Sequence, residues 1–250
     1  MKQIILAAGY ATRLYPLTEN TPKPLLPVGN SPMIEHVIEG TAATGAIERT
    51  YVVTNNKFTG QFTDWLTGYE HTHPDFKGTI INDNTTSNDD RLGAIGDLHL
   101  VLSQEDIHDD ILVIAGDNLI TGDLSEFGQC CRNSQGPVLG VYDVGSHEEA
   151  KKYGVVAIDE TGKITSFEEK PNVPQSTLIG IALYYYPRSV IPQISQYLEE
   201  GNNPDQHGRL IQWLYPNQPV QTALIPGQWL DIGSKETLET ANTLFSQPGQ

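Results

Sequence analysis

The amino-acid sequence predicts an α/β fold: a Rossmann-like, mostly parallel sheet flanked by helices, with a small β-rich subregion. Two observations predict this class. In the first half, short apolar runs alternate with segments of helical periodicity, as in parallel sheets with crossover helices. After Pro137 the pattern changes to strands and a hairpin. The chain has 250 residues, 38% hydrophobic and 18% charged, which suits an ordinary globular core.

The first half supplies four expected strands separated by three expected helices. The strands are residues 3–8, 51–54, 79–81 and 111–115. The helices are residues 33–44, 58–66 and 92–102. Ligands of parallel sheets collect beyond the carboxyl ends of strands, which directs attention to the loops that begin at Gly9 and Gly116.

The second half predicts more strand. We expect strands at 138–142 and 178–185, and a hairpin of 155–158 with 164–167 around Asp-Glu-Thr-Gly. Ser146 is expected to open a short helix through a capping box. Further helices are expected at 190–198 and about 235–244.

Net charge and cysteine content limit the classes of partner. The chain carries 31 acidic and 15 basic residues, a formal charge of −16, which opposes binding to nucleic acid or anionic lipid. Solubility is the simplest reason for this charge, and a salty habitat is the alternative. No apolar run approaches the length of a membrane span. The two cysteines, Cys130 and Cys131, are adjacent and form no disulfide framework, so a cytoplasmic location is expected.

The loop after the first strand has the composition of a phosphate site. Small residues up to Gly9 let a ligand approach backbone amides, and Arg13 adds a fork-shaped cation. Lys23 stands between two prolines that hold its backbone extended. The alternative is a turn with two solvated cations. Two cations together in an acidic chain favour the phosphate site.

Two aspartates follow apolar segments far apart in the chain. Asp117 follows the strand 111–115, and Asp231 lies in Trp-Leu-Asp-Ile-Gly. Each by itself is more typical of a helix cap or turn. They are 114 positions apart (231 − 117), so the sequence pattern does not bring them together.

Residues 6–18 read Leu-Ala-Ala-Gly-Tyr-Ala-Thr-Arg-Leu-Tyr-Pro-Leu-Thr, and Pro22-Lys23-Pro24 follows. This segment resembles the signature of the sugar-1-phosphate nucleotidylyltransferases, which include the glucose-1-phosphate thymidylyltransferases. The family form is L-A-A/G-G-x-G-T-R-L-x-P-L-T, then P-K-P. Ala11 stands at the second glycine of the signature, a mild replacement unless the backbone there needs a positive φ.

The resemblance implies a role for each matching residue at the nucleotide. Arg13 and Lys23 are the expected catalytic cations, because they would stabilise charge on the triphosphate and the leaving pyrophosphate. Asp117 and Asp231 are the expected Mg²⁺ ligands. The expected nucleotide-binding residues are Leu6, Ala8, Gly9, Thr12, Arg13, Lys23, Leu92 and Gly116.

The resemblance also implies a sugar-phosphate site, at Gly154, Glu169 and Lys170. Lys152 stands where the thymidylyltransferase branch often has arginine. The glutamine that often reads the base is not evident, although Asn82 and Asp83 lie nearby.

The expected substrates are a nucleoside triphosphate, dTTP or UTP first, and a sugar 1-phosphate, glucose 1-phosphate first. One alternative is a cytidylyltransferase for phosphocholine or another phosphorylated alcohol, and another is a non-catalytic sensor of sugar nucleotides. A single domain over 1–245 is expected, with a nucleotide part to about 135, a sugar part at about 136–233 and a final helix at about 235–245. A homo-oligomer is possible, but the sequence identifies no interface for one.

Overall fold

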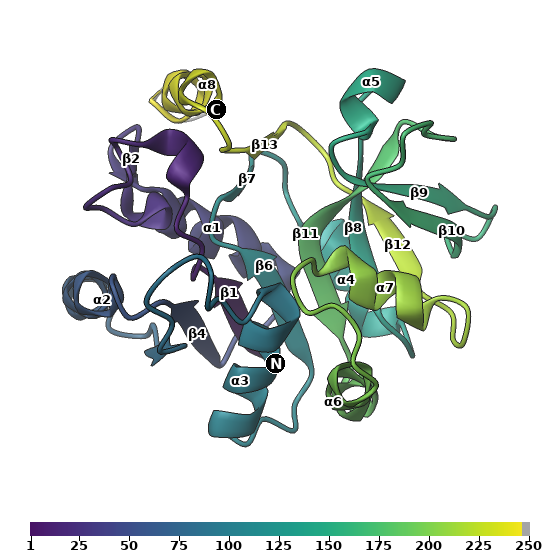
Figure 1. Ribbon diagram of the computed structural model, residues 1–250, viewed down its shortest axis with the longest axis horizontal. Helices are drawn as coiled ribbons and strands as arrows, with labels where there is room; N and C mark the ends of the chain where they lie inside the picture. The colour runs from purple at the N-terminus through teal and green to yellow at the C-terminus, as the bar shows by residue number, and fades with distance from the viewer. Residues whose placement is uncertain (247–250) are drawn as a thin grey trace.

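A nine-stranded sheet runs through the molecule in the order β10-β9-β11-β6-β1-β4-β5, with β8 and β12 attached beside β11 (Figure 1). The computed structural model describes residues 1–246. The strands of this sheet are β1 (Lys2–Leu6), β4 (Arg49–Thr54), β5 (Gly78–Asn82), β6 (Ile111–Ala115), β8 (Val138–Asp143), β9 (Gly154–Ile158), β10 (Ile164–Glu169), β11 (Leu178–Tyr186) and β12 (Gln221–Leu224).

The first half of the chain forms the parallel part of the sheet. Strands β5, β4, β1 and β6 pair in parallel in that order. Side chains alternate between the faces of a strand, so Ile4 lies in the core on one side of the sheet and Ile5 in the core on the other, both fully buried. The predicted fold class is confirmed.

Strand β11 joins the two halves of the sheet. It pairs antiparallel with β8 along one side, and on the other side with β9 near its start and with β6 near its end. The hairpin of β9 and β10 extends the sheet outward. These antiparallel pairings form the β-rich subregion expected after Pro137, and they leave the sheet continuous across both halves.

Helices cover both faces of the sheet. One core includes residues of α1 (Met33–Thr41), α2 (Thr59–Thr72) and α4 (Ser125–Asn133), and the other includes residues of α3 (Ala94–Gln104), α6 (Ile191–Glu199) and α7 (Gly208–Leu214). The short helix α5 (His147–Ala150) is capped by Ser146, whose hydroxyl accepts a hydrogen bond from the Glu149 amide. Within residues 1–246, no helix is both long enough and apolar enough to cross a bilayer.

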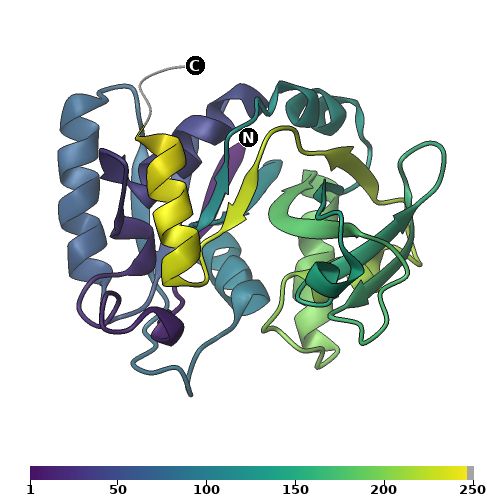
Figure 2. The same cartoon turned by 90° about the horizontal axis from the view of Figure 1, so that it is seen from above.

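The C-terminal helix returns to the beginning of the chain. Helix α8 (Lys235–Phe245) lies beside the N-terminal segment that contains the two-residue strands β2 (Pro27–Val28) and β3 (Ser31–Pro32) (Figure 2). Asn242 Oδ1 accepts a hydrogen bond from the Gly29 amide at 2.9 Å. This contact holds α8, which follows β13 (Trp229–Asp231), against the turn between β2 and β3, shortly after Lys23.

Several elements differ from the sequence prediction. Helix α2 continues to Thr72 instead of ending at residue 66, because Tyr69 is buried and stacks on Trp65. Helix α7, strand β12 and a short antiparallel pair, β7 (Asn118–Ile120) with β13 (Trp229–Asp231), were not predicted. Each is short, so its periodicity is weak in the sequence.

Gly128 allows α4 to approach the backbone of the short 3-10 helix Ala42–Thr44, which follows α1. A Cβ atom at this position would lie 2.1 Å from the Thr44 carbonyl oxygen. We therefore expect Gly128→Ala to lower the free energy of unfolding by about 1–3 kcal/mol, through overpacking against rigid backbone. Urea denaturation measures this difference.

The matched control is Gly68→Ala on the exposed face of α2, where no atom lies within 4 Å of an added Cβ. It should raise stability by about 0.5–1 kcal/mol through helix propensity. A Gly128→Ala protein as stable as the wild type would contradict the packing argument.

Candidate functional site

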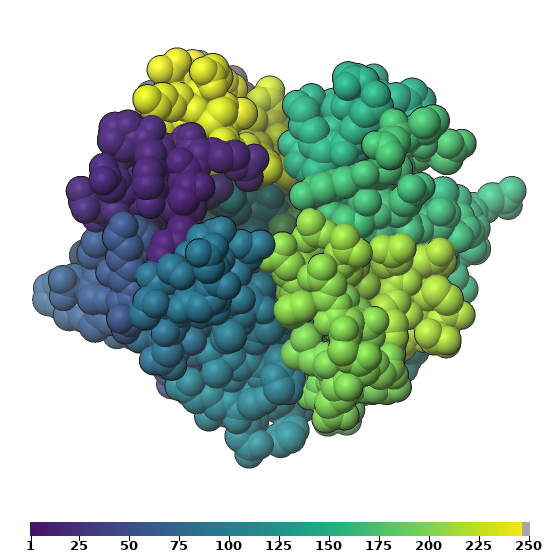
Figure 3. All heavy atoms as spheres, in the orientation of Figure 1, coloured from purple at the N-terminus to yellow at the C-terminus, as the bar shows by residue number. Residues whose placement is uncertain are grey.

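A cleft of about 630 Å³ lies between the parallel half of the sheet and the β-rich half. Figure 3 shows the molecule hollowed at the centre of one face, between its N-terminal, C-terminal and β-rich segments. Seven residues named from the sequence line this cleft: Leu6, Arg13, Asp117, Gly154, Glu169, Lys170 and Asp231.

The β7–β13 pair brings the two distant aspartates together. Asp231, the last residue of β13, pairs with Asn118, which directly follows Asp117. The Trp229 indole Nε1 donates to Asn118 Oδ1 at 2.6 Å and fixes the pair from the side. Burial raises the pKa of Asp231, and the Asp117 carboxylate raises it further. The positive charges of Lys23, Arg13 and Lys170 lower the pKa of Asp231 in part.

Lys23 lies behind the aspartates and ties them to the first loop. Its ammonium group forms an ion pair with Asp117 and donates to the Ile232 carbonyl at 2.7 Å. Its side chain is 15% exposed. Lys23 is thus already paired in this state, so contact with a leaving group would require it to exchange a partner.

The loop after β1 adopts a strained turn. Ala11 has φ 48° and ψ 40°, in the left-handed region, so the alanine stands where the backbone does need a positive φ. The cost is about 1–2 kcal/mol relative to glycine. Thr18 Oγ1 donates to the Ala11 carbonyl at 2.7 Å and holds the turn. The short helix Thr12–Leu14 follows and presents Arg13 to the cleft.

A smaller hollow of about 210 Å³ adjoins the cleft. Leu6 and Ala94 line both spaces, and Ala8 and Gly9 line the hollow. Leu92 lines a neighbouring depression with Arg91 and Asp205.

The other two expected nucleotide-binding residues lie elsewhere. Among the described residues, Thr12 and Gly116 line neither the cleft nor the hollow. Thr12 is exposed, and Gly116 packs against Pro24 with its amide bound to the Leu6 carbonyl at 2.9 Å.

The β9–β10 hairpin supplies the other wall of the cleft. Gly154 begins β9, and Glu169 ends β10 directly opposite it in the pairing register. Burial raises the pKa of the Glu169 carboxyl, while Lys170 and Arg209 lower it. Lys170 has φ 51°, and its amide donates to the Tyr153 carbonyl at 3.1 Å. A lysine held at positive φ beside a cleft is a strained arrangement of the kind that clusters at functional sites.

Aromatic residues that the sequence did not single out form the floor on this side. His207 stacks on Tyr184 with ring centroids 4.2 Å apart, and its Nε2 shares a hydrogen bond of 2.9 Å with the Tyr186 hydroxyl. Burial lowers the pKa of His207 to about 3, so the ring is neutral at ordinary pH. The sequence predicts Tyr184 only as part of the strand expected at 178–185, yet Tyr184 lines the cleft. Nothing in the local sequence marks His207.

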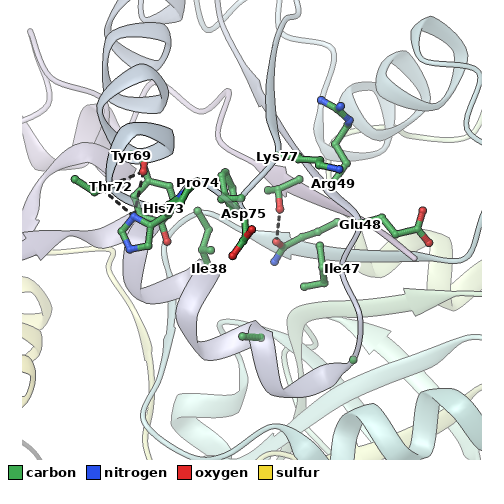
Figure 4. A pocket seen from close by; sticks show the side chains of 15 residues that line it. Ile38, Ile47, Glu48, Arg49, Tyr69, Thr72, His73, Pro74, Asp75 and Lys77 are labelled. Carbon is green, nitrogen blue, oxygen red and sulfur yellow. Dashed lines mark hydrogen bonds between the residues drawn. The ribbon is translucent and has the colours of Figure 1, made fainter.

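Another cavity, of about 520 Å³, lies away from the cleft, at the amino-terminal ends of parallel strands. Figure 4 shows the side chains that line it. The starts of β1 and β4 and the end of α2 form its walls. Gln3, which lines this cavity, donates from Nε2 to Thr41 Oγ1 at 2.7 Å, and its Oε1 accepts from Thr50 Oγ1 at 2.9 Å. None of the site residues named from the sequence lines this cavity.

The family model described as nucleotidyl transferase matches residues 2–247. The chain belongs to this family. The bifunctional protein GlmU of Methanocaldococcus jannaschii is 28% identical over 97% of this chain and 53% of its own length. A UTP–glucose-1-phosphate uridylyltransferase of Synechocystis is 29% identical over 93% of this chain and 60% of its own length. The chain thus spans little more than half of these curated relatives.

A solved structure from Bacillus anthracis, provisionally described as a glucose-1-phosphate thymidylyltransferase and crystallised with sucrose, has the same fold. Its TM-score is 0.84 and its sequence identity 26%, over 100% of this chain and 97% of that one. The mixed sheet with flanking helices is therefore a property of the family.

The two neighbouring carboxylates should lower the stability of the unliganded protein. Because the pKa of Asp231 is raised in the folded state, the folded protein holds that proton more tightly than the unfolded chain. Stability is therefore lost as pH rises from the unfolded value of 3.8 through the folded one. We expect Asp231→Asn to melt at a higher temperature than the wild type at pH 7.5 in EDTA, and this gain to vanish near pH 4.

Differential scanning calorimetry measures both melting temperatures. Asp64→Asn on the exposed face of α2 is the control and should leave the melting temperature unchanged. A lower melting temperature for Asp231→Asn at pH 7.5 would show that Asp231 stabilises the unliganded fold.

Proposed function

We propose that this protein transfers a nucleotidyl group from a nucleoside triphosphate to a sugar 1-phosphate and releases pyrophosphate. One observation carries the proposal. A single cleft combines two neighbouring carboxylates, Asp117 and Asp231, with the cations Arg13 and Lys170 and the half-buried carboxyl of Glu169. Phosphates require the cations, and sugar hydroxyls suit a carboxylate acceptor. Family membership supports the same reaction class.

The reaction is an in-line displacement at phosphorus. A phosphate oxygen of the sugar 1-phosphate forms a bond to the α-phosphorus of the nucleotide. The bond from the α-phosphorus to the bridging oxygen breaks, and pyrophosphate leaves with the electron pair. Such transfers depend mainly on alignment and charge neutralisation, so no side chain has to act as nucleophile.

Asp117 and Asp231 suit a divalent cation of the magnesium type. Within residues 1–246, no three or more His, Cys, Asp or Glu residues group as metal ligands, which argues against a site closed by protein alone. Magnesium is usually held by one or two carboxylates together with substrate phosphates and water. The raised pKa of Asp231 beside Asp117 indicates a pair of like charges that a cation would relieve. When bound, Mg²⁺ would neutralise charge on the reacting phosphates.

The remaining residues bind and orient the substrates. Arg13 faces the cleft from the first loop, where it would hold the triphosphate, and Lys23 would assist by exchanging its contact with Asp117. On the opposite wall, Lys170 would hold the sugar phosphate, while Glu169 and the Gly154 backbone would receive the sugar.

UTP or dTTP and glucose 1-phosphate are the substrates we propose. The names of the Synechocystis and Bacillus anthracis relatives point to uridylyl and thymidylyl transfer to glucose 1-phosphate. We place the reaction in the cytoplasm, because both cysteines are free and a reducing compartment suits them.

We predict that Asp117→Asn, Asp231→Asn and Lys23→Ala each reduce turnover by about a hundredfold or more, since each removes a group that stabilises charge in the transition state. Magnesium-dependent release of pyrophosphate, measured by a coupled assay, tests this. Lys77→Ala removes an exposed cation at the opposite cavity and serves as the matched control. Near-normal turnover in all three site variants would refute the proposed function.

Lys170→Met should act on one substrate alone. The change keeps an apolar stem and removes the charge, so the KM for the sugar phosphate should rise about ten- to a hundredfold, the equivalent of about 1.5–3 kcal/mol for a hydrogen bond to a charged group. The KM for the nucleotide should change little. Lys163→Met, at the far end of the same hairpin, is the control. Equal increases in both KM values would contradict a sugar-phosphate role for Lys170.

A further inference from the structure

The hollow beside the cleft has the position of a nucleobase pocket. It adjoins the Gly9 loop and opens toward Arg13 through the shared residues Leu6 and Ala94. If the triphosphate lies along that loop, as the proposed function requires, the base of the same nucleotide extends into this hollow. Its volume is about 210 Å³.

A carboxyl group without a partner lies in the wall of this hollow. Asp97, in the first turn of α3, is 6% exposed, and its neighbours Ile95 and Leu98 are fully buried. Its Oδ1 atom is buried and has no hydrogen-bond partner among the described residues. The first two amides of α3 are unavailable to it, because they donate to the carbonyls of Asp205 at 3.3 Å and Pro204 at 2.8 Å.

The other charged groups of the hollow do not satisfy Asp97. Asp83, 7% exposed, accepts hydrogen bonds from the Thr85 amide at 2.7 Å and hydroxyl at 3.0 Å. Burial raises the pKa of the Asp83 carboxyl, and these two hydrogen bonds lower it only in part. Arg91 forms a two-pronged pair with Asp205 at 2.8 and 3.2 Å.

Two further ionisable groups near the hollow, Tyr10 and Asp90, carry no positive charge that could pair with Asp97. Tyr10 is a buried phenol whose pKa is raised by burial. Asp90 is bound by the Thr86 and Ser87 amides.

These neighbours favour the neutral form of Asp97. Removal from water opposes a negative charge, and the Asp83 carboxylate opposes it again. Both effects raise the pKa of Asp97 to about 7, burial being the larger. A neutral carboxyl group presents one O–H donor beside one C=O acceptor, the same pair that a side-chain amide presents. The segment 82–97 contains no glutamine, and the asparagine that lines the hollow is Asn88.

We propose that Asp97 is a base-reading residue, whose neutral carboxyl group pairs with the N3–H donor and a neighbouring carbonyl of uracil or thymine. This inference rests on the proposed function and extends it to one residue. An ionised carboxylate would place two acceptors against the carbonyl oxygens that flank N3–H, so deprotonation should weaken pyrimidine binding. Leaving such buried polar groups unpaired is costly.

The test is the affinity of the intact protein for UTP and dTTP with Mg²⁺ and no sugar phosphate, measured by isothermal titration calorimetry at pH 6 and pH 8. With a pKa of about 7, the neutral fraction of Asp97 falls about tenfold over this interval, so wild-type affinity should fall about tenfold. Asp97→Asn keeps a donor and an acceptor at both pH values and should lose this dependence. Asp97→Leu should bind about tenfold or more weakly at pH 6.

The phosphates of the nucleotide and its Mg²⁺ complex also make the affinity depend on pH, but this contribution is the same for all variants. The comparison therefore isolates the contribution of Asp97. An Asp97→Asn protein with the pH dependence of the wild type would overturn the proposal. So would GTP binding more tightly than UTP and strengthening at pH 8, because an ionised carboxylate suits the two adjacent N–H donors of guanine. Circular dichroism melts establish that the variants are folded.

Wild-type pyrophosphate release with a sugar 1-phosphate separates this proposal from the proposed function. If the wild type releases pyrophosphate but the Asp97 variants do not show the expected pH dependence of nucleotide affinity, only the base-reading role is refuted. Absence of release with every nucleotide refutes the proposed function, and the base-reading role with it.

Discussion

The cleft depends on the short antiparallel pairing of β7 with β13. These strands come from the middle of the chain and from near its C-terminus, and their register sets Asp231 against Asn118, beside Asp117. Two carboxylates at this spacing repel each other, so the pairing needs support. Trp229 supplies a hydrogen bond to Asn118, and Lys23 binds both Asp117 and the Ile232 carbonyl. The fold therefore holds the two carboxylates in place through two side chains, and this arrangement is the basis of the cation site that we propose.

The charge of the whole chain explains why the cations are so localised. A protein with 31 acidic and 15 basic residues has a long-range field that repels nucleotides and sugar phosphates. Arg13, Lys23 and Lys170 all lie close enough to Asp231 to lower its pKa. The three come from separate segments, two before β2 and one after β10, and the sheet brings them to one place. A local positive charge that could attract phosphate therefore forms only in the folded protein, where these three cations come together.

The sequence predicts the parallel half well, because its strands are apolar runs separated by helices with one buried face. Residues 111–115 were predicted with the bounds of β6. The sequence pattern fails where elements are short or where their partners lie far apart in the chain. Nothing local pairs residue 118 with residue 231, and only the family resemblance predicted that Asp117 and Asp231 belong to one site. Asp97 was missed although it carried a signal, since it lies on the apolar face of its helix with Leu98 and Val101. His207 had no such signal, because its burial depends on β11.

Four departures from ordinary folding preferences lie at the cleft or at the hollow beside it. Ala11 and Lys170 have positive φ without being glycine, at opposite walls. Asp97 and His207 each hold a buried polar atom without a partner, Oδ1 in one and Nδ1 in the other. Each such feature costs folding free energy, of order 1–3 kcal/mol for a strained residue or an unpaired polar group. Selection for stability alone would remove them one at a time. These features coincide with the places where we propose that the nucleotide and the sugar phosphate bind, so binding of both substrates should raise the stability of the folded protein.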